Sequence, residues 1–541
     1  MFGSIYLNLE RNLTDFQKQP YMRIHLLLSL CLALVMYHGK SADNYKNTDW
    51  NHIGSESGAY INGKQLNLMD FGCKADNATD NSTALQNAIK SLNGSSGVIE
   101  IPAGNYVFKK SISIPSNILI KGQGSDKTIL NFNLNGSGDI FSIQGNVSNV
   151  SSPVLSGTTK GSSTVKVSNT AGFAAGDYVL VKQTANSLLA SSWAYSSFFQ
   201  IVKISKIKGN EISFSNSLHL DFPASNNPVI QKINPVQQVG IESLKIKRND
   251  ASSGQTSNIF FNYAVNCWVK GVELENCNYA HITLQSSANT TVSGNYLHDA
   301  FDYGSGGKGY GVVMQFGASD NFIFDNIAKH LRHSFLLQAA ANGNVIAYNY
   351  SYDPYWTEGW FPAASAGDVV LHGNYPYANL FEGNIFQNLV IDNSHGINGP
   401  DNTFFRNRIE SYGIVMNGNS GDNMHFIANE ITGSGLLKGL YNIEGGNHSE
   451  IANNIKGSLQ SGNITESSLI NKNYTSKIGS PNAVGAWKNE ACIRNGKAVK
   501  TIVSNTTKSA SETVSTTETT PVKTKTPKKP KKKCCVKKKK K

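Results

Sequence analysis

The sequence is poor in charged residues and in cysteine, and each scarcity excludes a class of protein. Only 16% of the 541 residues are charged and no Gly-X-Y period is present, which excludes a coiled coil and a collagen. The seven cysteines form no CxxC pair, which argues against a structural zinc site and a disulfide framework. The one marked apolar run, Leu26–Met36, excludes a multi-pass membrane protein.

The apolar run Leu26–Met36 predicts export of the protein. Its length suits the hydrophobic region of a signal peptide and is too short to span a bilayer, and Arg23 precedes it. Residues 1–42 are interpreted as an N-terminal extension and signal peptide, with Met22 as an alternative start. We expect a mature chain that is secreted or held at the cell surface, without a membrane span. The alternative is an N-terminal anchor or a buried apolar segment.

A lysine-rich tail carries the whole net charge of +12. Residues 500–541 contain 14 Lys and two Glu, so the rest of the chain is neutral. The Thr- and Lys-rich composition offers too little apolar surface to fold, and we expect this tail to be disordered. Its predicted partner is an anionic surface or polymer; a nuclear-localisation-like signal and a tail without a specific role are the alternatives. The neutral body predicts no specific nucleic-acid partner.

The middle of the chain repeats a short pattern in which Asn opens an apolar run and Asn or Gly follows five residues later. Examples are Asn321–Asn326, Asn344–Asn349 and Asn402–Asn407. The base period is about 22 residues with loop insertions, which is typical of a solenoid. The runs are short and rich in β-branched and aromatic residues, which is typical of strands. We therefore predict a parallel β-helix whose Asn residues occupy tight turns and hydrogen-bond from coil to coil.

The segments around the repeats predict a cap and an insertion. Thr83–Asn93 has an apolar face and reads as a helix that closes the N-terminal end, with Asp80 or Ser82 as its N-cap. Residues 154–235 alternate as half-buried strands and read as a small β insertion, which either packs on the solenoid or contacts carbohydrate. The predicted divisions are 67–153 for the cap and first coils, 236–495 for the main β-helix and 500–541 for the tail.

Four N-terminal segments carry a familiar pattern: Asp70–Asp76, Asp80–Ile89, Ile101–Tyr106 and Ile120–Gly124. They resemble the N-terminal signature of the pectate-lyase superfamily. This resemblance implies an all-β, right-handed, single-stranded parallel β-helix. It leaves the reaction open, because the superfamily includes lyases, glycoside hydrolases, epimerases and phage tailspikes. Ca²⁺ is the one cofactor that it suggests, and no strand face carries a convincing carboxylate cluster to bind the ion.

The third strand of each coil offers a line of outward polar side chains. We align His281–Gln285, Gly311–Gln315, Ser334–Gln338, Asp368–His372, Ser394–Asn398 and Gly413–Asn417. Because side chains alternate along a strand, the fifth positions share the outer face. These positions are Gln285, Gln315, Gln338, His372, Asn398 and Asn417.

Titratable residues concentrate around these strands and predict the active site. Arg332 is expected to meet a substrate carboxylate and His333 to act as base. Asp368 and His372 are expected to orient that base or to protonate the leaving oxygen, and His395 joins the cluster. The predicted substrate-binding residues are Lys308, Tyr310, Gln315, Gln338, Tyr355, Trp356 and Trp360. The expected reaction is lyase-type elimination on an acidic, uronate-containing polysaccharide.

Two other functions remain open from the sequence. Hydrolysis requires two carboxylates across the glycosidic bond, and Asp368 with Glu358, Asp353 or Asp392 could supply them. Ser394–Gly396 resembles the Gly-His-Gly of polygalacturonases, but the Asp-Asp pair of that family is missing. The third possibility is a carbohydrate-binding or adhesive surface protein without catalysis, which would use the same aromatic loop.

Overall fold

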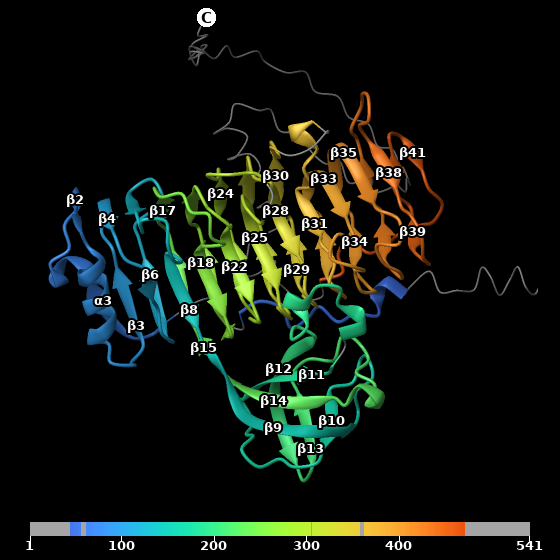
Figure 1. Ribbon diagram of the computed structural model, residues 1–541, viewed down its shortest axis with the longest axis horizontal. Coiled ribbons are helices and arrows are strands. Elements are labelled where there is room, and N and C mark those ends of the chain that lie inside the picture. Colours follow the sequence, from blue (N-terminus) through green and yellow to red (C-terminus); the bar gives the residue numbers. More distant parts are fainter. Residues whose placement is uncertain (1–43, 56–60, 185, 305, 358–361, 471–541) are drawn as a thin grey trace, which may run out of the picture. The chain divides into compact units, whose positions relative to one another are not determined.

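The computed structural model describes residues 44–55, 61–184, 186–304, 306–357 and 362–470 (Figure 1). The predicted signal peptide, the lysine-rich tail, Glu358, Trp360 and the last part of the predicted main β-helix (residues 471–495) lie outside the described residues. Within the described part of the chain, no helix has the length and apolar character needed to span a membrane.

A parallel β-helix forms the body of the protein, with three strand rows that we call faces 1, 2 and 3. Face 1 contains β1 (Lys64–Asn67), β3 (Gly97–Glu100), β6 (Ile118–Lys121), β16 (Gly240–Glu242), β20 (Trp268–Lys270), β23 (Thr291–Ser293), β26 (Phe322–Phe324), β29 (Val345–Ala347), β32 (Leu380–Glu382), β34 (Thr403–Phe405), β36 (His425–Ile427) and β39 (Ser449–Ile451).

Face 2 contains β2 (Asp76–Asp80), β4 (Gly104–Phe108), β7 (Thr128–Phe132), β17 (Lys245–Arg248), β21 (Glu273–Glu275), β24 (Tyr296–His298), β27 (Ile327–Lys329), β30 (Tyr350–Tyr352), the first parts of β33 (Ile385–Ile391) and β35 (Arg408–Met416), β37 (Glu430–Ile431), β40 (Asn454–Ile455) and the antiparallel β41 (Ser458–Leu459). Face 3 contains β5 (Ile112–Ser113), β8 (Phe141–Gln144), β18 (Ser257–Asn262), β22 (Ala280–Gln285), β25 (Tyr310–Gln315), β28 (His333–Leu337), β31 (Val369–Leu371), the last parts of β33 and β35, and β38 (Leu440–Asn442). A short parallel pair, β15 (Val236–Gln237) and β19 (Ala264–Val265), lies beside these rows.

Alternation along each strand builds the core. In β25, Val312 and Met314 point inward and join a cluster of buried aliphatic and aromatic side chains that runs through the coils. Phe381, Phe404 and Phe426 stack from coil to coil, with ring centroids 4.8 and 5.1 Å apart. Burial of this apolar surface is the main favourable contribution to folding, and it accounts for the β-branched and aromatic runs of the sequence.

Two asparagine ladders border face 1, as predicted. In one of them each side-chain amide donates to the next, for example Asn349 Nδ2 to Asn384 Oδ1 at 3.0 Å and Asn384 Nδ2 to Asn407 Oδ1 at 2.9 Å. The predicted left-handed conformation is present at some repeat positions, such as Asn266 (φ 54°) and Asn289 (φ 52°). In the ladders it belongs instead to the residue before the Asn, such as Tyr348 (φ 55°) and Arg406 (φ 53°). The ladder Asn therefore contributes its two-sided amide and not a left-handed backbone.

The N-terminal helix and the β insertion are both present, so the predicted fold class is confirmed. The helix α3 (Ser82–Ser91) covers the first coils, and Asn81, not Asp80 or Ser82, occupies its N-cap position. The Asp80 carboxylate instead accepts from Ser82 N at 3.0 Å. The other helices are single 3-10 turns: η1 (Asn44–Lys46), η2 (Leu68–Phe71), η3 (Asn186–Leu188), η4 (Ser192–Ala194), η5 (Ala224–Asn226) and η6 (Ala363–Ser365).

The insertion is a closed antiparallel barrel with its own core (Figure 1). Its strands are β9 (Asn146–Ser156), β10 (Thr164–Val167), β11 (Tyr178–Lys182), β12 (Phe199–Lys208), β13 (Glu211–Phe214) and β14 (Val229–Asn234). A buried polar cluster joins it to the solenoid: His219 Nε2 lies 3.2 Å from Asp320 Oδ1, and His219 Nδ1 lies 3.1 Å from Asn342 Oδ1. Ile201 N also donates to Ser319 Oγ at 3.1 Å.

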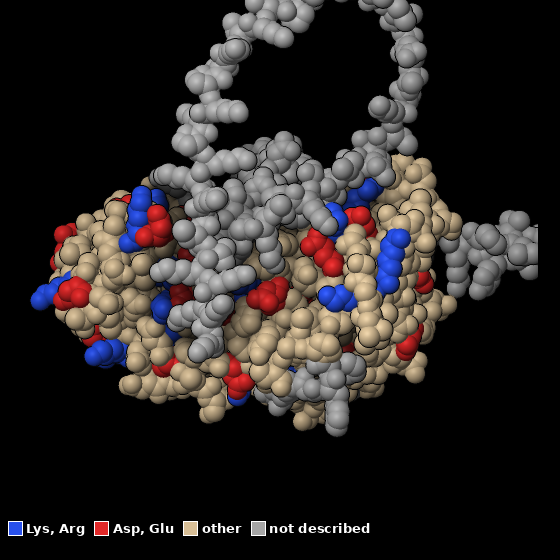
Figure 2. All heavy atoms as spheres, turned by 90° about the horizontal axis from the view of Figure 1, so that it is seen from above, with Lys and Arg blue, Asp and Glu red and all other residues tan. Residues whose placement is uncertain are grey.

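Charged side chains on the surface are of mixed sign. On the side drawn in Figure 2, basic and acidic residues of the described part lie next to one another. Among the described residues, several charged side chains pair with one of opposite sign, for example Lys232 with Asp177 at 2.7 Å and Lys308 with Asp302 at 2.6 Å. This mixture agrees with the neutral charge balance of residues 1–499.

Candidate functional site

The register of face 3 lines up one polar side chain per coil. Gln285 is paired with Gln315 across β22 and β25, and the registers of β28, β31 and β33 place Gln338, His372 and Asp392 in the same line. The sequence alignment was wrong for one coil, because Asn388–Asp392 and not Ser394–Asn398 continues the row. The outward residue of that coil is therefore Asp392, and Asn398 belongs to the following turn.

The glutamines of this line bond to one another. Gln338 Nε2 donates to Gln315 Oε1 at 2.8 Å, and Gln315 Nε2 donates to Gln285 Oε1 at 3.1 Å. Tyr279 Oη donates to Gln315 Oε1 at 3.1 Å. Gln315 and Gln338 are predicted substrate ligands, and in this structure their amides build a fixed polar ladder that leads to His372.

His372 and Asp392 form a hydrogen-bonded pair at the end of this ladder. His372 Nδ1 lies 2.7 Å from Asp392 Oδ2, and the side chains are 20% and 15% exposed. Ser394 Oγ donates to Asp392 Oδ1 at 2.5 Å. Burial favours a higher pKa for Asp392. The hydrogen bond and the charge of His372, together with the hydrogen bonds from Ser394, outweigh this effect and lower the pKa of Asp392. Asp392 is thus an ionised carboxylate that fixes the orientation of the imidazole.

His395 faces His372 from the loop that follows β33. The two rings are 4.8 Å apart and nearly perpendicular, at 85°. Burial lowers the pKa of His395, and the neighbouring His372 lowers it further. His395 Nδ1 lies 3.1 Å from Ser191 Oγ of the barrel insertion. The structure therefore brings together two of the predicted histidines, and it adds Asp392 and Ser191 to them.

His333 lies deeper in the same region. Its ring centroid is 6.3 Å from that of His372 and 5.0 Å from that of Tyr310. Its Nδ1 donates to the carbonyl of Gly367 at 2.7 Å, and the residue is 7% exposed. Burial, together with the charges of Arg332 and His372, lowers the pKa of His333 to about 3. His333 is therefore neutral at physiological pH and lacks the basicity of a general base that works near neutrality.

The two positively charged side chains predicted near the site, Arg332 and Lys308, are held by the loop that precedes β25. Arg332 Nη1 donates to the carbonyl of Gly304, and Arg332 N donates to the carbonyl of Gly309 at 2.8 Å. Lys308 Nζ pairs with Asp302 Oδ2 at 2.6 Å. Arg332 lies close enough to lower the pKa of His333, so its positive charge contributes to the region of the histidines.

Asp368 is separated from solvent. It is fully buried, its Oδ2 accepts from Gln387 N at 2.5 Å, and burial raises its pKa to about 7. This position, at the corner between faces 2 and 3, suits a structural carboxyl group that braces β33. It offers no direct contact to a substrate on face 3.

The predicted aromatic residues pack into a loop cluster. Tyr355 stacks on His330 at 4.7 Å and meets Tyr303 edge-on at 5.1 Å. Trp356 Nε1 donates to the carbonyl of Pro362 at 3.1 Å. Trp360 lies outside the described residues. The described aromatic side chains thus hold the long loop together while Tyr355 and Trp356 stay partly exposed.

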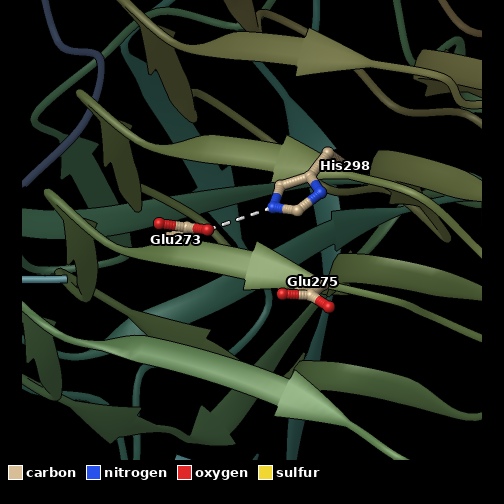
Figure 3. Close-up of side chains that lie close together, drawn as sticks. All are labelled: Glu273, Glu275 and His298. Carbon is tan, nitrogen blue, oxygen red and sulfur yellow. Dashed lines mark hydrogen bonds and ion pairs between the residues drawn. The ribbon is translucent and has the colours of Figure 1, made fainter. Parts of the chain in front are cut away.

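One group of described residues has the spacing of metal ligands: Glu273, Glu275 and His298 on face 2 (Figure 3). Lys245 Nζ, however, already lies 2.8 Å from Glu273 Oε1 and 2.5 Å from Glu275 Oε2. Burial favours a higher pKa for Glu273, but His298 and Lys245 outweigh it and lower the pKa to about 2. The lysine ammonium supplies the positive charge that a metal would bring, so this group fits a salt-bridge network better than Ca²⁺.

Two features of the site were not predicted from the sequence. They are the pairing of His372 with Asp392 and the contact of Ser191 in the barrel with His395. The 2.7 Å pair follows from the strand register, which the wrong alignment of one coil concealed. Ser191 and His395 are 204 residues apart, and no periodicity of the sequence connects them.

The chain is similar to known β-helix proteins. Residues 65–174 match the family model of rhamnogalacturonase A/epimerase, pectate lyase-like. The tailspike protein gp49 from Pseudomonas phage LKA1 has 17% identity and a TM-score of 0.53, over 68% of this chain and 64% of the phage chain. The tailspike gp61 of Pseudomonas phage phi297 has 16% identity and a TM-score of 0.45, over 69% and 64%. The chain therefore spans less than two thirds of either phage protein.

A further similar structure is the Gp54 tailspike of Acinetobacter baumannii bacteriophage AP22, in complex with A. baumannii capsular saccharide. It has 16% identity and a TM-score of 0.39, over 71% of this chain and 68% of the phage chain. Comparison with curated proteins found no match. At 17% identity and a TM-score of 0.53, the likeness to gp49 shows the parallel β-helix fold alone, and the match to the pectate lyase-like family model covers residues 65–174.

Proposed function

We propose that the protein acts on an extended acidic polysaccharide and that His372 is the general base. The observation that carries this proposal is the 2.7 Å contact between His372 Nδ1 and Asp392 Oδ2 on the exposed side of face 3. An ionised carboxylate at Nδ1 keeps the proton on that nitrogen and leaves Nε2 available to accept another. We therefore transfer the role of base from His333, whose burial keeps it neutral with a pKa of about 3, to His372.

Lyase-type elimination is the reaction that these residues support best. A base removes the proton beside the uronate carboxylate, and a positive charge near that carboxylate stabilises the developing anion. His372 would take the proton, and Arg332 would supply the charge. We assign protonation of the departing glycosidic oxygen to the protonated form of His395, whose ring lies 4.8 Å from that of His372; burial disfavours this form because it lowers the pKa of His395.

Hydrolysis has less support among the described residues. Asp368 is fully buried, Asp392 is engaged with His372, and Asp353 pairs with His330 at 3.0 Å. A hydrolase needs two carboxyl groups facing each other across the bond. Glu358 lies outside the described residues and stays a candidate from the sequence alone.

Incubation with polygalacturonate, alginate and hyaluronan tests the proposal. New ultraviolet absorbance from unsaturated ends, together with new reducing ends, would identify a lyase. Reducing ends without that absorbance would favour hydrolysis, and retention of the protein by a polymer without either signal would favour a binding protein. We also propose that the protein is exported and that its lysine-rich tail attaches it to an anionic surface or polymer. The mass of the mature N-terminus tests export.

A further inference from the structure

The barrel insertion sends one loop onto the polar line of face 3. This loop joins β11 to β12 and carries η3 and η4. Asn374 Oδ1 of the solenoid accepts from Ala190 N at 2.9 Å and from Ser191 N at 3.0 Å. Gly396 lies directly beneath the loop, and a Cβ at Gly396 would lie 2.6 Å from Ala190 Cβ. Two hydrogen bonds from backbone N–H groups, together with the space left by a glycine, thus hold the loop in one position.

Two side chains of this loop reach the histidine region. Ser191 Oγ lies 3.1 Å from His395 Nδ1. The Trp193 ring meets His395 edge-on, with centroids 5.4 Å apart at 82°, and it lies 5.7 Å from Phe316 at the end of the β25 coil. Trp193 therefore extends along the edge of face 3 from the glutamine ladder to His395.

Trp193 is at the same time held and exposed. Its contacts with His395 and Phe316 restrict the ring, yet 42% of the residue is accessible to solvent. A single exposed apolar residue needs no explanation by itself, but the Trp193 ring is fixed against His395, which belongs to the candidate site. A flat aromatic ring offers a large, rigid apolar surface at low entropic cost, and the apolar C–H face of a pyranose ring fits such a surface.

We propose that the barrel insertion completes the substrate site: Trp193 stacks against a sugar ring of the polysaccharide next to the unit from which His372 removes a proton, and Ser191 positions His395. This inference rests on the proposed function, because it assigns Trp193 a subsite on the same polymer. The insertion is then a specificity element and not only a packing element.

Binding of polygalacturonate, alginate and hyaluronan by affinity electrophoresis tests the role of Trp193. Trp193→Ala should weaken binding of the polymer that the wild type retains by about tenfold, as expected for the loss of one stacking contact. Trp193→Phe should bind nearly as well as the wild type. Tyr195→Ala is the matched control, because Tyr195 lies beside the same turn and is 44% exposed.

The outcomes separate this inference from the proposed function. If the wild type binds and cleaves a polymer and Trp193→Ala equals it, the stacking role is wrong while the proposed function stands. If the wild type neither binds nor cleaves any polymer, the proposed function fails and the inference fails with it. Should Trp193→Ala unfold, Trp193→Leu decides, because it retains apolar packing without an aromatic face.

Ser191 is a positioning residue, and the pH profile of turnover tests it. Ser191→Ala removes the hydroxyl at His395 Nδ1 and should shift the profile, whereas Ser191→Thr should restore it. An unchanged profile in Ser191→Ala would overturn the positioning role, since a merely structural change would lower stability without moving the pH dependence.

Discussion

His372 and Asp392 lie 20 residues apart in the chain, and their side chains meet at 2.7 Å because they occupy the same register position on consecutive coils of face 3. The strand spacing of about 4.8 Å brings such residues into contact at every coil. At three consecutive coils of this face the neighbours are Gln285, Gln315 and Gln338, which hydrogen-bond to one another. At the next two coils they are an imidazole and a carboxylate.

Replacement of the carboxylate tests the role of this pair. Asp392→Asn removes the charge that holds the imidazole in one tautomer, and turnover should fall on the order of 10²- to 10⁴-fold. Asp353→Asn is the control, because Asp353 forms a similar pair with His330 at 3.0 Å. Steady-state kinetics of both variants are the measurement. A large loss in Asp353→Asn with little loss in Asp392→Asn would favour the hydrolytic alternative.

The buried carboxyl of Asp325 should make stability fall as pH rises. Burial raises its pKa to about 8, and its Oδ1 has no hydrogen-bond partner in the described structure. The protonated form is favoured in the folded state, so its stabilising contribution is complete below the unfolded pKa near 4 and is lost as pH rises toward 8. Asp325→Asn keeps a residue that tolerates φ 57°, and its melting temperature should exceed that of the wild type at pH 8 but not at pH 4.

The junction between barrel and solenoid should respond to pH through His219. Burial opposes the charged form, but Asp320 outweighs it and raises the pKa of this histidine. The stabilisation is therefore complete below the unfolded pKa of about 6.5 and is lost as pH rises through the folded value, with a slope of up to about 1.4 kcal/mol per pH unit. Denaturant unfolding from pH 6 to 9 should show this decline. His219→Asn should flatten it, and the exposed His52→Asn should leave it unchanged.

The asparagine ladder should be a major source of stability. Asn384 is fully buried, donates to Ile346 O and Asn407 Oδ1, and accepts from Asn349. Asn384→Ala leaves several buried groups unsatisfied, each at a cost of about 1–3 kcal/mol. Denaturant unfolding should record a loss of about 2–4 kcal/mol. The exposed Asn105→Ala serves as control, and an equal effect in both variants would contradict the role of the ladder.

The fold could be predicted because its determinants repeat along the sequence. Asn pairs with the same spacing bracket successive strands of face 1 at Asn321–Asn326, Asn344–Asn349 and Asn402–Asn407. The helix at residues 82–91 and the alternating pattern of the insertion were also readable. The local chemistry at each of these places agrees with the global arrangement.

The site was predicted less well, for two physical reasons. The strand β33 runs from Ile385 to Ile391 across the corner between faces 2 and 3 without a loop, so no turn signal marks where face 3 begins. Asp392 and Asn398 each follow apolar residues, and the pattern alone does not distinguish them. The contact of Ser191 with His395 depends on how the barrel docks, which no repeat encodes.

Turnover of an acidic polysaccharide by His372→Ala decides whether His372 is the general base. The matched control is His298→Ala, because His298 Nδ1 pairs with Asp299 Oδ2 at 2.8 Å on face 2. Both proteins should be folded by circular dichroism, and ultraviolet absorbance of unsaturated ends should follow the reaction. We expect His372→Ala to lose the activity and His298→Ala to keep it. Full activity in a folded His372→Ala would show that His372 is not the base.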